Sequence, residues 1–217
     1  MKLLVFDTET TSLKPGQICQ LSYITIDSST KPQKTTGHNF FFAVEEVDPA
    51  AEAVHGFSAE KLYELSNGKY FEDSIEEFLK DFEEADFLIG HNVNFDIRFL
   101  KHELEGLCID YEPKNVFCTM QYYKNKCNIP NGYGSIKNPK LEEVINYLGI
   151  TKDTISKKSE ELFKGSGDYH DARFDTTATY LTIIEGFKQG KIKPGYFSNL
   201  LKIYWLCLIK SKIFELS

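Results

Sequence analysis

The chain has 217 residues, 41% of them hydrophobic, which suffices for one substantial core, and no Pro/Gly/Ser-rich linker divides it. Its formal net charge of −7 excludes a high-affinity, non-specific nucleic-acid coat protein, because such proteins present a basic surface. The five cysteines include no C-x-x-C pair, which excludes the usual zinc-ligand and disulfide frameworks and indicates free thiols in a reducing compartment.

The first half of the chain predicts a three-stranded meander followed by helices. Apolar runs bounded by turn residues indicate strands at 2–9, 18–27 and 38–44. Apolar residues at helical spacing then indicate helices at Ser58–Leu65 and Phe71–Glu84.

The second half alternates helices with short strands. Its patterns predict a strand at 86–90, a helix at about Asn94–Glu105, a strand at 116–120, and helices at Lys140–Leu148 and about Ala172–Lys188. The polar, glycine-containing segment 151–169 is expected to be a mobile loop. Three strands followed by alternating helices and strands predict an α/β fold, a ribonuclease H-like mixed sheet flanked by helices.

Five polar residues interrupt otherwise apolar segments of these elements. Asp7 and Glu9 end the first strand and, being two residues apart, face the same side of it. Asp96 lies in the first turn of a helix, and His170 and Asp175 flank the start of the last one. Burying four carboxylates together is costly unless a divalent cation neutralises them. Because such oxygen ligands favour Mg²⁺ or Mn²⁺, the pattern predicts metal-dependent phosphodiester cleavage.

The segments that carry these residues resemble the three motifs of the DEDDh, or DnaQ-like, 3'-5' exonucleases, a family that includes the epsilon proofreading subunit of bacterial DNA polymerase III. The resemblance rests on D-x-E after an apolar strand, H-N-x-x-F-D after another, and H-D-A-x-x-D opening a late helix. It spans roughly residues 1–190. It implies that His170 is the general base and that four carboxylates organise two metal ions: Asp7, Glu9, Asp96 and Asp175.

The same resemblance implies contacts to the terminal nucleotide from three segments of the chain. The residues concerned are Thr10, Thr11, Leu13, His55, Asn92 and Phe95. The backbone of the two threonines, with Leu13, would cradle the nucleotide, and His55 would flank its base. One position departs from the family pattern, because Ser12 stands where glycine is common. The backbone after Thr11 is therefore expected to bend differently.

These expectations define a two-metal mechanism. We expect His170 to accept a proton from a water molecule that one ion, bound by Asp7, Glu9 and Asp175, activates. Asp7 and Asp96 are expected to hold a second ion, which in two-metal sites lies about 4 Å from the first and stabilises the leaving oxygen. The expected product is a nucleoside 5'-monophosphate.

The predicted function is a 3'-5' exonuclease that acts on single-stranded DNA 3' ends in proofreading or repair. An exoribonuclease with the same five residues, trimming RNA or short oligonucleotides, is an alternative, because only contacts to the 2'-hydroxyl discriminate the two sugars. A non-catalytic module that binds strand ends is a third hypothesis. The general base argues against the third, since a binding module does not need one.

Residues 191–217 are interpreted as an extension of the exonuclease domain at 1–190. The apolar part, 196–217, is either a docked helix or a surface that binds a polymerase or a second copy of the chain. It is too short and too rich in lysine for a membrane span, and no signal peptide precedes the first acidic residue, so we expect a cytoplasmic protein. Arg98 could guide the backbone of a nucleic-acid strand, but its ordinary interpretation is a solvated surface charge; three tyrosines are interpreted as packing residues: Tyr122, Tyr123 and Tyr133.

Overall fold

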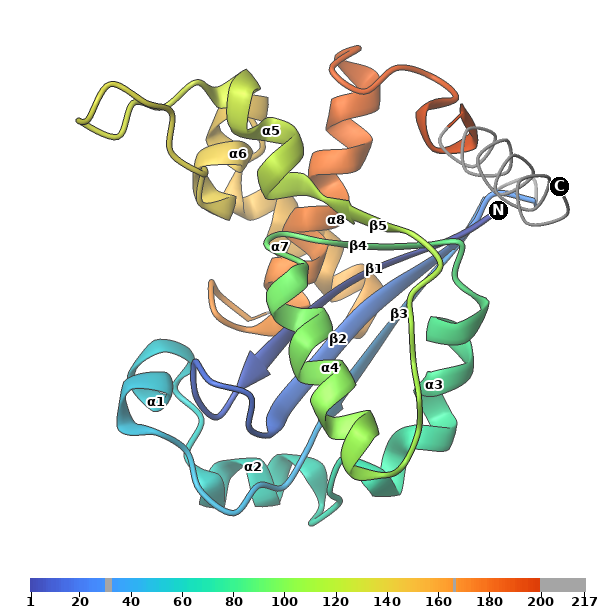
Figure 1. The fold of residues 1–217 in the computed structure, drawn as a ribbon, viewed down its shortest axis with the longest axis vertical. Coiled ribbons are helices and arrows are strands. Elements are labelled where there is room, and N and C mark those ends of the chain that lie inside the picture. The colour runs from blue at the N-terminus through green and yellow to red at the C-terminus, as the bar shows by residue number, and fades with distance from the viewer. Residues whose placement is uncertain (30–32, 166, 200–217) are drawn as a thin grey trace, which may run out of the picture.

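The computed structural model describes residues 1–29, 33–165 and 167–199, whose strands form one mixed sheet in the order β3-β2-β1-β4-β5 (Figure 1). The strands are β1 (Lys2–Thr10), β2 (Ile18–Asp27), β3 (Lys34–Phe41), β4 (Phe87–Gly90) and β5 (Val116–Cys118). β2 is antiparallel to β1 and β3, whereas β4 is parallel to β1 and β5. The predicted meander and mixed sheet are confirmed.

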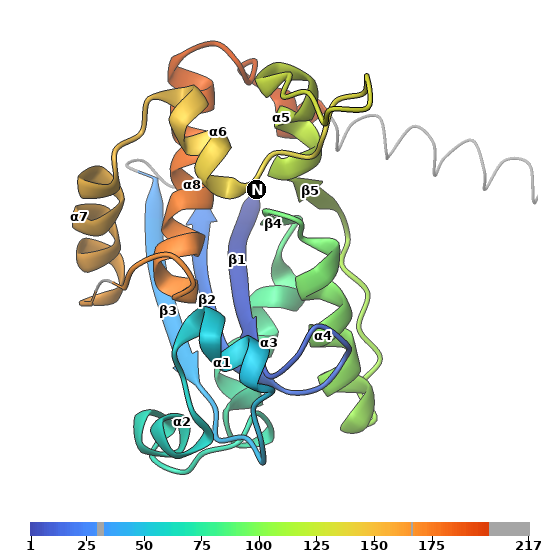
Figure 2. The ribbon, with the colours of Figure 1, turned by 90° about the vertical axis from the view of Figure 1, so that its left-hand side faces the viewer.

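Helices cover both faces of this sheet (Figure 2). One face carries α3 (Ile75–Glu84) and α4 (Asn94–Gly106). The other carries α6 (Leu141–Leu148), α7 (Lys152–Phe163) and α8 (Ala172–Lys188), with α8 lying directly on β1 and β2. The short helices α1 (Pro49–His55) and α2 (Ala59–Ser66) lie at the end of the sheet where β1 stops (Figure 1).

The side chains of β1 alternate between two hydrophobic cores. Leu3 and Val5 pack in the core under α8, while Leu4 and Phe6 pack in the core under α3 and α4. This alternation continues past the apolar residues because successive side chains of a strand point to opposite faces. The pair of acids that ends β1 therefore lies on the α8 face, and the threonine between them lies on the α4 face.

Some boundaries differ from the sequence prediction. β3 pairs with β2 over Lys34–Phe41 instead of 38–44, because the polar residues before 38 join the sheet edge while the apolar residues after Phe41 are buried in the connection to α1. β5 ends at Cys118, and the residues predicted to end that strand instead begin α5 (Thr119–Cys127). The helix expected from Phe71 begins with a 3₁₀ turn and is α-helical only from Ile75.

The prediction of a mobile loop at 151–169 is wrong, because most of that segment is α7. Thr151 caps the helix by accepting a hydrogen bond from the Thr154 N–H (3.2 Å). Ile155 and Ser159, four residues apart, are buried on one face of the helix, and the remaining positions are mostly exposed. This narrow buried stripe is enough for α7 to pack on β3 and α8. Because the rest of the helix is polar, its amino-acid composition resembles that of a loop.

Two of the three tyrosines interpreted as packing residues do pack. Tyr122 packs against the core under α8, and Tyr123 is buried there and donates its hydroxyl hydrogen to the Thr182 carbonyl (2.8 Å). Tyr133 is instead 93% exposed, on a loop between α5 and α6. Its two neighbours, Gly132 and Gly134, both have left-handed backbone, which turns the chain too sharply to bring the ring back onto the core.

The chain after α8 continues along the same core. Ile192 and Phe197 are buried there, and the Phe197 ring meets Phe87 and Phe117 edge to face. Most of the apolar segment 196–217 lies outside the described residues, so its predicted docking or partner binding stays a prediction. None of the helices in the described ranges combines the length and the apolar character of a transmembrane segment.

Candidate active site

Three carboxylates converge where β1 ends. Asp7 and Glu9 project from the α8 face of the strand, and Asp175 reaches them from the first turn of α8. One ligand oxygen from each lies within 4.8 Å of the others. Glu9 is buried, and one carboxylate oxygen of Asp175, Oδ1, is buried with no hydrogen-bond partner among the described residues. Residues separated by 168 positions in the sequence (7 to 175) thus form one acidic cluster.

The fourth predicted carboxylate, Asp96, is not among the three converging ligands and lies on the other face of the sheet, near enough that, after burial, its charge raises the pKa of Asp7. Asp96 is buried in the first turn of α4, and its Oδ1 accepts hydrogen bonds from the N–H (3.2 Å) and the hydroxyl (2.8 Å) of Thr8. β4 pairs with β1 only as far as Val5, so the Thr8 N–H has no strand partner on that side. Asp96 supplies the missing acceptor and is thereby fixed beside Asp7.

The start of α8 positions the predicted general base next to this cluster. Asp171 is the N-cap of the helix, and the preceding residue, His170, is exposed with a left-handed backbone (φ 66°). The His170 N–H donates to Asp175 Oδ2 (3.0 Å). The backbone of His170 is therefore bonded to one carboxylate of the cluster, and its imidazole extends from that point.

Burial and mutual repulsion disfavour the ionised forms of these acids. Burial first, and then the charges of Asp96 and Asp175, raise the pKa of Asp7 well above its ordinary value, and burial with Asp175 does the same to Glu9. Burial also raises the pKa of Asp96 to about 7, although the Thr8 hydrogen bonds oppose the shift. The pKa of Asp175 is likewise raised by burial to about 7.

The donor set of the cluster fits a hard divalent cation. All three converging ligands are carboxylates, and Asp175 Oδ1 is buried with no hydrogen-bond donor in the part of the chain that the structure describes. A cation among these oxygens would satisfy that atom and remove the repulsion that raises the pKa values.

A cavity of about 640 Å³ opens beside the acids and collects four of the six predicted nucleotide contacts: Thr10, Leu13, His55 and Phe95. Glu9 also lines it, so the cavity and the cluster are continuous. Thr11 lines an adjacent hollow instead. Asn92 lines neither of the two and has a left-handed backbone whose carbonyl accepts from the Phe95 N–H (2.8 Å).

The His55 ring lines the cavity as a neutral imidazole. Its Nδ1 accepts from the Phe57 N–H (3.1 Å), so the neutral ring carries its proton on Nε2. Nε2 is buried near the Thr10 backbone without completing a hydrogen bond to a described residue. Burial lowers the pKa of His55, which keeps the ring neutral at physiological pH.

The loop between β1 and β2 forms one wall of the cavity, and α4 holds both of its ends. Arg98 donates to the Leu13 carbonyl (3.2 Å) while its guanidinium lies over Phe95, and Glu103 accepts from the Ile18 N–H (2.7 Å). Leu13 is 83% exposed at the mouth of the cavity. Ser12 has no left-handed backbone, so serine fits this loop without strain where the family commonly has glycine.

Three residues that hold the site together were not singled out from the sequence as functional: Thr8, Gln20 and Arg98. Gln20 offered the clearest signal, since a long polar side chain stands in a strand of mostly apolar residues and is completely buried there. Thr8 and Arg98 offered none, because a threonine in a strand and an arginine on an exposed helix face are ordinary.

Comparison with known proteins agrees with this arrangement. A family model described as an exonuclease, RNase_T, matches residues 4–181. The chain is 26% identical over 204 residues to the 3'-5' exonuclease DinG of Staphylococcus haemolyticus, which covers 93% of this chain and 20% of that protein. It is 36% identical over 113 residues to the DNA polymerase III subunit epsilon of Rickettsia conorii, which covers 49% of this chain and 46% of that protein.

Solved structures of exonuclease I share the fold. One has a TM-score of 0.68 and another, the zinc-bound complex of the Escherichia coli enzyme with single-stranded DNA, has 0.67. Each is 17% identical and covers 93% of this chain and 43% of that chain. The fold and the acidic cluster thus define a ribonuclease H-like exonuclease domain.

The chain belongs to the RNase_T exonuclease family, among its DnaQ-like 3'-5' exonucleases, as the three motifs predict. It spans less than half the length of the two relatives named above.

Proposed function

We propose that this chain is a divalent-metal-dependent 3'-5' exonuclease that releases nucleoside 5'-monophosphates from DNA 3' ends. The observation that carries the proposal is the cluster of Asp7, Glu9 and Asp175, whose oxygens lie within 4.8 Å of one another, beside a cavity of about 640 Å³. An acidic cluster that can hold cations and an adjoining cavity that can hold a nucleotide are the two parts that end-directed hydrolysis needs.

In this proposal the three clustered carboxylates bind the metal, and Asp96 assists from the α4 side. Two Mg²⁺ or Mn²⁺ ions, when bound, would increase the acidity of a water molecule and stabilise charge on the leaving oxygen. Asp7 would contribute to cation binding both with Glu9 and Asp175, which converge on it, and with Asp96, whose charge it feels.

His170 is the proposed general base. A ring nitrogen of the neutral imidazole accepts the proton of the attacking water, and the exposed position of the side chain allows that proton to pass to solvent. The bond from the His170 N–H to Asp175 Oδ2 keeps this arm near the cluster.

The cavity supports recognition of a terminal nucleotide by shape and stacking. Phe95 offers a ring to a base, Leu13 stands exposed at the mouth, and the neutral His55 ring lines the wall. We propose a single-stranded 3' end as the occupant, in line with the single-stranded DNA held by the related exonuclease I.

DNA is favoured over RNA as the substrate because one named relative is a DNA polymerase III subunit and the exonuclease I complex holds single-stranded DNA. An exoribonuclease remains the second candidate, since no described contact distinguishes a 2'-hydroxyl. A non-catalytic strand-end module is not favoured, because Asp175 Oδ1 is left unsatisfied, as expected of a metal ligand.

The test is digestion of 5'-labelled single-stranded DNA and RNA of one sequence with Mg²⁺, with Mn²⁺ and with EDTA. Stepwise shortening from the 3' end with release of 5'-mononucleotides, lost in EDTA, is the expected result. Asp7→Asn should reduce the rate at least about 10³-fold, and Asp153→Asn, which removes an exposed acid of α7, should leave it unchanged. A wild-type rate in Asp7→Asn would end the proposal.

We further propose that residues 1–190 are the exonuclease domain, that the start of the extension 191–217 docks on it through Ile192 and Phe197, and that the apolar remainder binds a polymerase or a second copy of the chain. Removal of residues 200–217 should then leave mononucleotide release intact and abolish any self-association seen by analytical ultracentrifugation. An unchanged sedimentation pattern would leave the polymerase as the partner to be tested by co-purification.

A further inference from the structure

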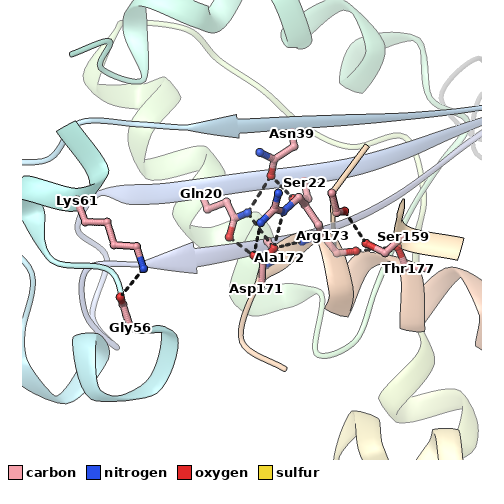
Figure 3. Close-up of polar contacts among 11 residues, drawn as sticks. Gln20, Ser22, Asn39, Gly56, Lys61, Ser159, Asp171, Ala172, Arg173 and Thr177 are labelled. Atoms are coloured by element: carbon pink, nitrogen blue, oxygen red, sulfur yellow. Dashed lines mark hydrogen bonds and ion pairs between the residues drawn. The ribbon is translucent and has the colours of Figure 1, made fainter. Parts of the chain in front are cut away.

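Gln20, a side chain of β2, links the strands of the sheet to the start of α8 (Figure 3). We propose that Gln20 is a positioning residue for hydrolysis: its amide fixes residues 171 and 172, and thereby holds His170 and Asp175 in place against Glu9. The proposal deepens the nuclease function above and rests on it.

The Gln20 side chain is completely buried, and both ends of its amide are used. Its Oε1 accepts from the Ala172 N–H (3.0 Å), the first amide of α8. Its Nε2 donates to Asp171 Oδ1 (3.1 Å) and to Asn39 Oδ1 (2.8 Å) on β3. One amide thus joins two strands to the first residue of the helix and to its N-cap.

The two residues that Gln20 bonds, Asp171 and Ala172, lie in the sequence between His170 and Asp175. His170 immediately precedes Asp171, and Asp175 follows Ala172 by less than one helical turn. On the other side, Gln20 is the cross-strand partner of Glu9 in the β1–β2 register. Gln20 therefore connects the acids of β1 to the segment that carries the proposed base and the third ligand.

The chemistry of this position requires a group that both accepts and donates. The amide of Ala172 at the helix start needs an acceptor, whereas the carboxylate of Asp171 needs a donor. Arg173 supports Asp171 from the outside through its Nε (2.9 Å to Oδ1) and Nη2 (2.6 Å to Oδ2). A glutamate at position 20 would keep the acceptor but oppose a second negative charge to Asp171, and an aliphatic side chain would supply neither bond.

A matched pair of variants separates positioning from general stability. Gln20→Met conserves volume and removes the two bonds at the helix start together with the bond to Asn39 on β3. Tyr123→Phe removes one buried hydrogen bond to the same helix, at the Thr182 carbonyl, far along from the site. Gln20→Glu keeps only the bond from the Ala172 N–H and serves if the methionine variant folds poorly.

Three measurements are made on the wild type and the variants: kcat and KM on a short single-stranded DNA, Mn²⁺ affinity by titration calorimetry without substrate, and amide hydrogen exchange of residues 170–176. In Gln20→Met and in Gln20→Glu, kcat should fall at least about tenfold with KM changed less than about threefold. Exchange at the helix start should accelerate, and Mn²⁺ binding should weaken. Tyr123→Phe should alter none of the three by more than about twofold.

The outcomes distinguish this inference from the proposed function. An active wild type whose kcat survives Gln20→Met and Gln20→Glu would overturn the role of Gln20 while the nuclease assignment stands. An inactive wild type would overturn the nuclease assignment. The Mn²⁺ affinity and hydrogen exchange would still test whether the Gln20 hydrogen bonds hold the start of α8. Unchanged exchange at residues 170–176 would overturn that grip. Equal losses of kcat in Gln20→Met and Tyr123→Phe would show that α8 needs stability only, and would overturn positioning.

Discussion

At the scale of single residues, backbone N–H groups hold the carboxylates of the site in position: that of Thr8 bonds Asp96, and that of His170 bonds Asp175. His170 illustrates this, because it is outside the group of three converging carboxylates and meets it only through its own N–H. Proton transfer and cation binding should therefore be separable functions of neighbouring residues.

We expect His170→Gln to lower kcat by about 10²–10⁴-fold, the usual contribution of a general base, while Mn²⁺ affinity stays within about threefold of wild type. Rate assays and titration calorimetry measure the two effects. The control is His102→Gln, which replaces an exposed histidine on α4. It should change neither kcat nor Mn²⁺ affinity. Loss of cation binding in the His170 variant would contradict the separation.

Arg98 acts on the wall of the cavity and not on the acids. Since it donates to the Leu13 carbonyl and lies over Phe95, Arg98→Ala should loosen the loop and raise KM several-fold with little change in kcat. Steady-state kinetics on short single-stranded DNA provide the measurement. Lys101→Ala, one turn along the same helix, removes an ion pair to Glu112 and should leave KM unaltered.

At the scale of elements, the sequence predicts those parts whose burial is regular. β1, β2 and β4 are apolar runs, and the three motifs lie at the ends of predicted elements, so the convergence of Asp7, Glu9 and Asp175 could be expected. α1, α5 and α7 were missed, because two buried residues in each of α5 and α7 and none in α1 leave almost no period to detect.

The contacts between elements were beyond reach for a different reason. The bond from Thr8 to Asp96 depends on where β4 ends relative to β1, and the grip of Gln20 on α8 depends on the register of β2. Both are properties of packed pairs of elements, which no local pattern in one segment encodes.

The packing of α7 on β3 provides a prediction at this scale. A Cβ added at Gly37 would lie 2.7 Å from the Leu162 carbonyl oxygen, so Gly37→Ala must push α7 away from the sheet. We expect a loss of about 1–3 kcal/mol in the free energy of unfolding, measured by urea denaturation. Gly106→Ala on α4 meets nothing within 4 Å and should be neutral or slightly stabilising. Equal stability of both variants would refute the close approach.

At the scale of the whole molecule, the acidic cluster sets how stability depends on pH. Asp96 and Asp175 have pKa values of about 7 in the folded chain against an ordinary 3.8, mainly because they are buried. A carboxyl whose pKa is raised by folding contributes stability that is complete below the ordinary pKa and is lost as pH rises through the folded value. The metal-free protein should therefore weaken between pH 4 and pH 8.

In EDTA, we expect the midpoint of thermal unfolding to be on the order of 5 °C lower at pH 8 than at pH 5. Mn²⁺ should restore most of this loss at pH 8 and add little at pH 5, where protons compete for the same oxygens. Differential scanning fluorimetry measures both effects. Asp175→Asn should flatten the pH dependence, and an undiminished fall in that variant would contradict the assignment.

The location of the acids on the innermost strand has a consequence for heat inactivation. β1 lies between β2 and β4 and is covered by helices on both faces, so it cannot fray without the collapse of everything around it. α1, in contrast, buries no residue and closes one side of the cavity proposed to hold the nucleotide. On warming, binding of the nucleic-acid 3' end should weaken first and KM should rise. The catalytic rate should persist until the whole domain unfolds cooperatively.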